Sequence, residues 1–254
     1  MKARIPFLLA LSTLVPAALH AAVSITPSAG FSITYDGNDG ANFNAAAPPG
    51  GSIVPNNLAL ASNGATPFAS SDLGAQLNIP FHRAVNINDG FYGNSNSWIS
   101  SDSDPGPQAF AGVRLTGLVN LTGIAFGRDN GNNATDACGG QCTDRSLGIY
   151  TLQFTNDAGA TWNNIGMLNY DGVGDDGVLG GAFTSYFRHQ FGVSATGGAP
   201  IVANGVRILV PVSGLGGGTA IDEIELFGTP VPEPTGAALA LLGLAGLALR
   251  RRRA

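Results

Sequence analysis

Hydrophobic and polar residues alternate with a period of two in several short stretches of this 254-residue chain. The longest such stretch covers residues 150–155, where Tyr150, Leu152 and Phe154 are separated by polar residues. Shorter stretches of the same kind lie at residues 124–126, 206–210 and 224–226. This spacing is typical of strands with one buried face, and it predicts an all-β domain.

Turn-forming residues separate these stretches. Asn156-Asp157-Ala158-Gly159 follows the longest one, and a segment rich in Gly and Asp covers residues 171–177. Gly tolerates positive φ and Asp caps its own backbone, so both segments predict turns. No long 3.6-residue period occurs outside the two ends of the chain. Many short strands joined by Gly-rich loops predict a jelly-roll β-sandwich.

The first 22 residues have the layout of a secretory signal peptide. Lys2 and Arg4 precede an apolar stretch from Ile5 to Leu19, and the small residues Ala21 and Ala22 follow it. The alternative is an uncleaved membrane anchor, but the apolar stretch is too short to span a bilayer. We therefore expect the protein to be exported.

The last 25 residues, 230–254, form a second apolar segment. A proline-rich stretch, Thr229–Pro234, is followed by the apolar run Gly236–Leu249 and by Arg250–Arg253. The run is shorter than the roughly 20 residues that an untilted membrane-spanning helix needs. Positive charge stays on the cytoplasmic side, so the arginines fix its orientation. The pattern predicts a short hydrophobic helix that holds the exported protein transiently in the inner membrane.

The segment Val231–Ala254 resembles a PEP-CTERM sorting signal, because Pro232, Glu233 and Pro234 precede the apolar helix and the arginine block in the same order. The resemblance implies processing by an exosortase, a membrane-embedded cysteine transpeptidase. It also implies transfer to the cell surface or extracellular matrix of a Gram-negative-type cell that produces exopolysaccharide or biofilm. The alternative is an ordinary C-terminal anchor.

Charge is distributed unevenly along the chain. Residues 22–249 carry 6 basic and 17 acidic side chains, a net charge of −11. A domain this acidic repels phosphate backbones and anionic membranes, so we expect no nucleic-acid partner. Cys138 and Cys142 lie close together in the sequence. In an oxidising compartment, this pair favours a small disulfide loop over a metal site or a redox pair.

Three segments between residues 80 and 229 resemble the discoidin, or coagulation-factor type C, domain, a galactose-binding-like jelly roll. They are residues 88–99, 144–162 and 220–228. The chain departs from the family pattern at Asn156-Asp157-Ala158-Gly159, where many members have an unbroken Asp-Gly turn. Residues 23–79 match less well, and we expect them to supply a first strand and long loops.

This resemblance implies a structural calcium ion. Asp89 falls on the early acidic ligand of the family and Glu223 on the acidic ligand of the final strand, while carbonyls near Gly90 to Ser95 would complete the site. Calcium takes six to eight hard oxygen ligands. The alternative is that Asp89 only caps its turn and that Glu223 lies with Glu225 on an exposed strand face.

The resemblance also implies carbohydrate binding by loops at one end of the barrel. Sugar recognition needs an aromatic surface and planar polar groups. Trp98 and Trp162 occupy positions that the family uses for packing, so we expect them in the core. The loop candidates for ligand binding are Phe91, Tyr92, Arg128, Asn130 and Arg145. The alternative for the two arginines is a solvated pair with Asp129 or Asp144.

No sequence motif of a hydrolase, a zinc protease or a phosphate-binding loop is present. Only His82 and His189 remain after removal of the signal peptide, and a lone His is more often structural than catalytic. We therefore expect a protein that is not an enzyme. Two functions remain, a carbohydrate-binding module and a structural or adhesive surface protein without a saturable ligand pocket, with an enzyme of unknown type as a minor third.

Overall fold

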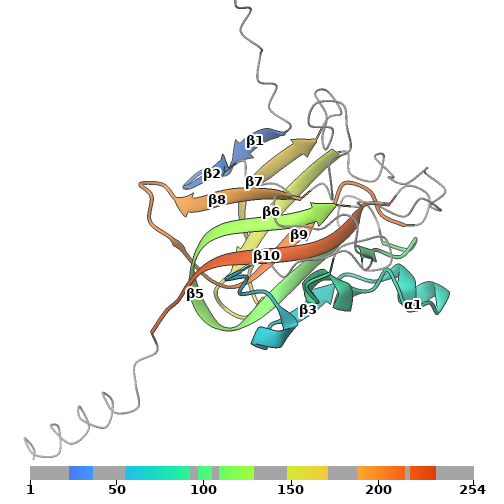
Figure 1. Ribbon diagram of the computed structural model, residues 1–254. Coiled ribbons are helices and arrows are strands. Elements are labelled where there is room, and N and C mark those ends of the chain that lie inside the picture. Colours follow the sequence, from blue (N-terminus) through green and yellow to red (C-terminus); the bar gives the residue numbers. More distant parts are fainter. Residues whose placement is uncertain are drawn as a thin grey trace, which may run out of the picture.

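The computed structural model describes residues 23–36, 55–91, 97–104, 109–128, 148–170, 188–214 and 218–232. Within these residues there are ten strands, and three short helical turns lie between β2 and β4 (Figure 1). The strands are β1 (Ser24–Pro27), β2 (Phe31–Tyr35), β3 (Thr66–Ala69), β4 (Trp98–Ile99), β5 (Phe110–Arg128), β6 (Gly148–Thr155), β7 (Asn163–Tyr170), β8 (His189–Ala195), β9 (Ile201–Leu209) and β10 (Ala220–Pro230). The helical turns are η1 (Ala61–Asn63), α1 (Leu73–Leu77) and η2 (Ala84–Asn88).

Strand β5 is shared by two sheets. Its first part pairs with β3 and β9, and its second part pairs with β8 and β10, all antiparallel. The first sheet has the order β1-β7-β6-β9-β5-β3, and the second has the order β2-β8-β5-β10-β4. The prediction of an all-β jelly-roll sandwich is confirmed. The expected signal peptide and the segment 233–254 lie outside the described residues, and no helix among the described residues is long and apolar enough to cross a membrane.

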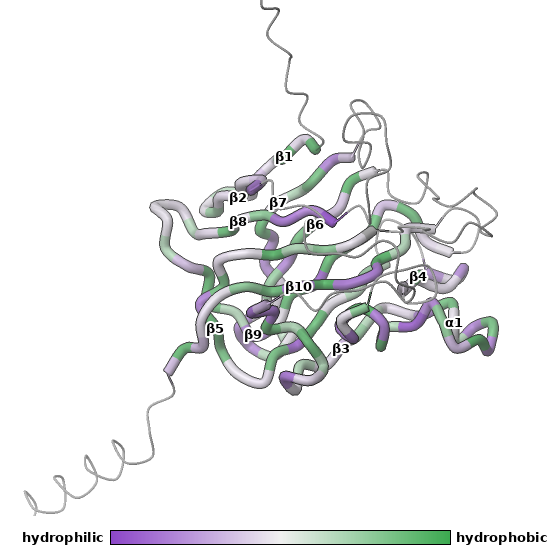
Figure 2. The backbone as a smooth tube through the Cα atoms, viewed as in Figure 1, coloured by the Kyte–Doolittle hydropathy of each residue, from purple (hydrophilic) through white to green (hydrophobic). Residues whose placement is uncertain are grey.

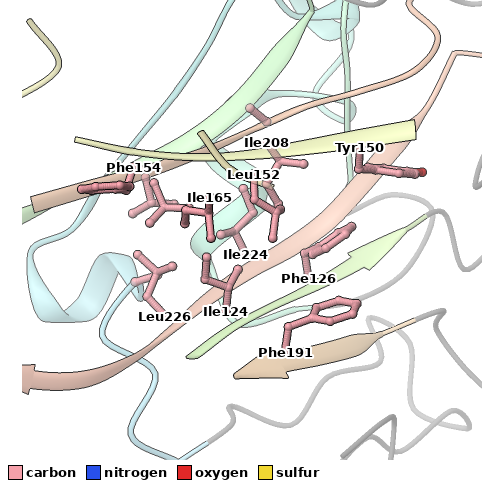
Figure 3. Close-up of a cluster of buried hydrophobic side chains, with 14 of the residues drawn as sticks. Ile124, Phe126, Tyr150, Leu152, Phe154, Ile165, Phe191, Ile208, Ile224 and Leu226 are labelled. Carbon is pink, nitrogen blue, oxygen red and sulfur yellow. The ribbon is translucent and has the colours of Figure 1, made fainter. Parts of the chain in front are cut away.

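The core lies between the two sheets (Figure 3). Leu152, Ile165 and Ile208 of the first sheet meet Ile124 and Ile224 of the second, and all five side chains are fully buried. Burial of this apolar surface is the main stabilising contribution to such a fold. Along the strands the hydropathy changes between green and purple or white (Figure 2), as the period-two pattern predicts.

Three buried side chains that carry polar atoms, Trp98, His82 and His189, have hydrogen-bond partners within the fold. Trp98 is fully buried, as expected, and its Nε1 donates to the carbonyl of Ser71 at 2.7 Å. His82 Nδ1 lies 2.9 Å from Ser97 Oγ, and His189 Nδ1 lies 3.1 Å from Tyr170 Oη. Both histidines are therefore held in structural hydrogen bonds.

A buried ion pair lies near the start of β8. Arg188 and Glu225 are each 1% exposed, and Arg188 Nε donates to Glu225 Oε1 at 2.8 Å. Arg188 also donates to Gln190 Oε1 at 3.0 Å. The contacts connect β8 to β10 across β5, because Gln190 pairs with Ala125 and Ala125 pairs with Glu225.

The N-terminal region is part of the same sandwich. Strands β1, β2 and β3 pair with β7, β8 and β5. Helix α1 begins after Asp72, whose Oδ1 accepts a hydrogen bond from the backbone N–H of Ala75 at 2.6 Å, a standard N-cap.

Candidate functional site

The structure brings Asp89 and Glu223 together. Asp89 ends the turn η2, and Glu223 lies on β10. The backbone N–H of Gly90 donates to Glu223 Oε2 at 3.2 Å. Gly90 has a φ of 87°, a left-handed conformation that glycine adopts at little cost. The loop can therefore fold back over the Glu223 carboxylate.

Asp89 does form the turn cap of the alternative interpretation, but Glu223 does not lie on the exposed strand face that this interpretation expects. Asp89 Oδ1 accepts a hydrogen bond from the backbone N–H of Phe91 at 2.8 Å, so Asp89 does cap its turn. Glu223 is 1% exposed and does not face solvent, and Glu225 is equally buried. Among the described residues, Glu223 Oε1 has no hydrogen-bond partner.

The surroundings of both carboxyl groups raise their pKa values and so disfavour the ionised forms. Burial raises the pKa of Asp89 to about 6. Burial, together with the nearby charge of Asp89, raises the pKa of Glu223 well above its usual range. Two carboxylates that approach each other away from water favour either protonation or a bound cation.

The pair supplies the oxygen chemistry that calcium prefers. Around it, the described residues form no group of three or more His, Cys, Asp or Glu side chains. A calcium ion at Asp89 and Glu223 would therefore take its other ligands from backbone carbonyls and water. Residues 92–96, most of the loop expected to supply those carbonyls, lie outside the described part of the chain.

The other predicted site residues are only partly described. Phe91 adjoins Asp89 and is 42% exposed. The backbone of Arg128 ends β5 opposite Ile221, close in sequence to Glu223, so the loop after β5 begins near the acidic pair. Pro232 is exposed beyond β10. The remaining predicted residues lie outside the described residues: Tyr92, Asn130, Cys138, Cys142, Arg145, Glu233 and Pro234.

A second candidate site lies on the outer face of the first sheet. Phe68 of β3, Phe110 and Arg114 of β5, Trp162 before β7 and Arg207 of β9 form it, and we call these five residues the aromatic-arginine face. Their strand neighbours Ala111, Val113, Val206 and Ile208 are buried. The five residues are half-buried or exposed, so they lie on the opposite side of the sheet from the core.

The five residues contact one another as alternating rings and cations. The Arg207 guanidinium carbon lies 4.4 Å from the Trp162 ring centre and 4.6 Å from that of Phe110. The Arg114 carbon lies 4.8 Å from the Phe68 ring centre. The centroids of Phe68 and Trp162 are 5.6 Å apart. Each cation–π contact contributes about 0.5–1 kcal/mol at an exposed site, so the cluster is held in a defined arrangement.

Polar amides continue the aromatic-arginine face across the sheet. The strand register places Phe68, Gly112, Arg207, Gln153 and Asn164 in one row over five strands. Arg207 Nε donates to Gln153 Oε1 at 2.6 Å, and Gln153 Nε2 donates to Asn164 Oδ1 at 2.5 Å. A Cβ at Gly112 would lie 2.6 Å from Phe68 Cζ. The missing side chain therefore leaves room for the Phe68 ring.

The aromatic-arginine face is not predicted from the sequence. Trp162 was expected in the core, but it is half-buried on the outer surface. The buried neighbours Val206 and Ile208 do indicate that Arg207 points outward. Nothing local to Arg207 indicates which aromatic rings surround it.

Comparisons with known proteins give structural similarity only. No family model and no curated protein matches the chain. Similar solved structures include chitosan-binding module 1 of a chitosanase/glucanase from Paenibacillus sp. IK-5, with 20% identity, a TM-score of 0.44, and coverage of 68% of this chain and 98% of that one.

Two further structures show the same level of similarity. The family 32 carbohydrate-binding module of C. perfringens NanJ, in complex with galactose, has 16% identity, a TM-score of 0.42, and coverage of 67% of this chain and 97% of that one. The C-terminal domain of a chitobiase from Bacteroides fragilis has 16% identity, a TM-score of 0.45, and coverage of 66% and 95%. With TM-scores below 0.5, these similarities do not establish what this chain binds.

Proposed function

We propose that the β domain is a non-catalytic carbohydrate-binding module. The observation that carries the proposal is the aromatic-arginine face with its adjoining amides. Sugars are bound through stacking of their apolar faces on aromatic rings and through hydrogen bonds from hydroxyl groups to planar polar side chains. Phe68, Phe110 and Trp162 supply the rings, and Gln153 and Asn164 supply the amides.

The length of the face favours an oligosaccharide over a single sugar. Adjacent strands lie about 4.8 Å apart, so a row that crosses five strands extends over about 19 Å. The row from Phe68 to Asn164 crosses β3, β5, β9, β6 and β7. A chain of several sugar units laid across the strands would contact rings at one end and amides at the other.

Titration calorimetry against a panel of soluble polysaccharides tests this proposal. Because Trp162 is the largest ring of the face, we expect Trp162→Ala to weaken binding about tenfold, equivalent to about 1.4 kcal/mol. Phe91→Ala is the matched control, since it removes an exposed aromatic ring from the predicted loop site. Loss of binding in Phe91→Ala alone would move the site to the loops. An absence of saturable binding to any polysaccharide would favour the purely structural or adhesive role.

A calcium ion bound by Asp89 and Glu223 is the second part of the proposal. It is supported by the burial of Glu223 and by the unpartnered Glu223 Oε1. We expect calcium to raise the melting temperature of EDTA-treated protein and Asp89→Ala to abolish the rise. Asp157→Ala is the control, because Asp157 is bonded to Thr155 and Thr161 of its own turn. An unchanged melting temperature on calcium addition would rule out the site.

Export and surface display complete the proposal. They are supported by the sequence of residues 1–22 and by the tail that contains Pro232, Glu233 and Pro234. The exported protein would be processed by an exosortase and retained at the cell surface or in the matrix. There the domain would bind polysaccharide, including the exopolysaccharide of its own cell.

A further inference from the structure

Arg114 and Arg207 lack acidic partners. Within the described residues, neither arginine forms an ion pair, and Arg114 donates no hydrogen bond. Arg207 donates only from Nε, to Gln153, so its two terminal nitrogens have no acceptor in that part of the chain. Guanidinium groups that are held in place with free N–H groups are available to an external acceptor.

Two other arginines whose side chains are described, Arg188 and Arg83, are used inside the fold. Arg188 is buried against Glu225, and Arg83 donates to the backbone carbonyls of Ile79 and Gly74. Residues 22–249 carry only 6 basic against 17 acidic side chains. The aromatic-arginine face therefore holds two of these six cations, on one surface of an acidic domain.

Within the described residues, the acidic turn between β6 and β7 forms no ion pair with Arg114 or Arg207. Asp157 lies in the turn between β6 and β7 and accepts hydrogen bonds from Thr155 Oγ1 and Thr161 Oγ1, each at 2.6 Å. These bonds lower the pKa of Asp157, so its carboxylate is ionised and fully used within its own turn. Burial lowers the pKa of Arg207, which means that an anion beside it would stabilise the charge.

We infer that the aromatic-arginine face selects acidic saccharides, in which uronic-acid carboxylates alternate with apolar sugar faces. This inference rests on the proposed carbohydrate-binding function and names its ligand class. A carboxylate accepts two parallel hydrogen bonds from the fork of one guanidinium. The sugar ring that carries it stacks on the neighbouring aromatic ring.

The geometry of Arg207 suits this role. Its guanidinium is fixed by Phe110, by Trp162 and by the hydrogen bond to Gln153, so little side-chain freedom is lost when an anion binds. Arg114 contacts the ring of Phe68 and offers a second carboxylate contact. Two cations separated by aromatic rings match a polymer with repeating carboxylates.

Calorimetry on the full-length protein tests the inference with polygalacturonate and alginate, each beside its carboxyl-reduced, neutral counterpart. We expect the acidic forms to bind at least tenfold more tightly. Salt should weaken the binding of the acidic forms and leave that of the neutral forms unchanged, since ionic strength screens charge pairs at the surface. Arg207→Gln should remove most of the preference, and Arg114→Gln should reduce it. Thermal melting checks that each variant is folded.

The outcomes separate this inference from the proposed function. Equal or tighter binding of the neutral forms would overturn the inference and leave carbohydrate binding intact. If the protein binds a neutral polysaccharide from the panel but neither polygalacturonate nor alginate, the inference is also overturned and carbohydrate binding is left intact. No binding to any saccharide would overturn both. Retention of the acidic preference in the double variant Arg114→Gln/Arg207→Gln would show that these residues do not carry it.

Discussion

Asp89 and Glu223 bind protons more tightly in the folded protein than in the unfolded chain. Burial raises the pKa of Asp89 from 3.8 to about 6, and burial together with the charge of Asp89 raises the pKa of Glu223 well above its usual value. Folding therefore favours the protonated forms. The stabilisation from Asp89 is fully present below its unfolded pKa near 4 and is lost as the pH rises through its folded pKa of about 6, and the contribution of Glu223 is lost in the same direction.

We expect the melting temperature of the calcium-free protein to fall between pH 4 and pH 7. Asp89→Asn should flatten part of this fall, because the amide does not titrate, and Glu223 should account for some of the remainder. Thermal melts in EDTA at several pH values measure both effects. An identical slope in Asp89→Asn and the unmodified protein would contradict the assignment. Added calcium should restore stability at pH 7, since the ion favours the ionised carboxylates.

The sequence indicated Asp89 and Glu223 through a family resemblance, but it could not indicate that Glu223 is buried. Two glutamates that alternate along a strand have the pattern of an exposed face. They are buried because distant segments fold over β10. Gly90 donates to Glu223, and Asn57 Oδ1 accepts from the backbone N–H of Leu226. Coverage of this kind depends on the tertiary fold.

At the scale of strands, local patterning predicted the central elements. The alternation at 150–155 lies within β6, and the shorter patterns lie in β5, β9 and β10. These strands alternate because one face packs on the core. Strand β3 has only four residues and no such alternation, yet it supplies Phe68. The sharing of β5 between two sheets follows from pairings with distant strands, which no local pattern specifies.

The aromatic-arginine face depends on strand register. Phe68, Phe110, Trp162 and Arg207 come from separate parts of the chain and meet only when β3, β5 and β9 align. A shift of one residue would turn Arg207 toward the core. The period-two pattern therefore predicts the direction in which each side chain points. The neighbours of each side chain can be identified only when the strand pairing is known.

Gly112 gives a direct test of this arrangement. We expect Gly112→Ala to destabilise the domain by about 1–3 kcal/mol, the usual cost of overpacking. The new Cβ would lie 2.6 Å from both Phe68 Cζ and the carbonyl oxygen of Val206. It should also weaken saccharide binding, because Phe68 must move. Urea unfolding and calorimetry measure the two effects.

Gly117→Ala is the matched control for that variant. Gly117 lies in the same strand, and a Cβ there would meet no atom within 4 Å. Equal unfolding free energies for the two variants would show that the space above Gly112 is not filled as described.

At the scale of the whole molecule, charge is divided between the two ends of the chain and the domain between them. The ends of the chain carry half of its basic residues, and the region between them is acidic. From this net charge we expect the domain to be repelled by nucleic acid and anionic lipid. The aromatic-arginine face, with Arg114 and Arg207, is a local exception among the described side chains.

We expect the double variant Pro232→Ala/Glu233→Ala to accumulate unprocessed in the membrane fraction, because the sorting motif would be lost. Gel mobility and fractionation of the producing cells measure the size and location of the protein. Pro230→Ala, which changes a proline at the end of β10, serves as the control. Normal size and location of the double variant would contradict sorting by an exosortase.

The position of β10 has a consequence for how the protein is made. β10 is the last strand of the described chain, yet it lies inside the second sheet, between β5 and β4. Until the ribosome has added residues 220–230, the second part of β5 lacks one neighbour, and the core lacks Ile224 and Leu226. Contacts this distant in sequence form late. The sandwich therefore cannot close until residues 220–230 have been synthesised, so folding of the domain is completed only when nearly all of the described chain is present.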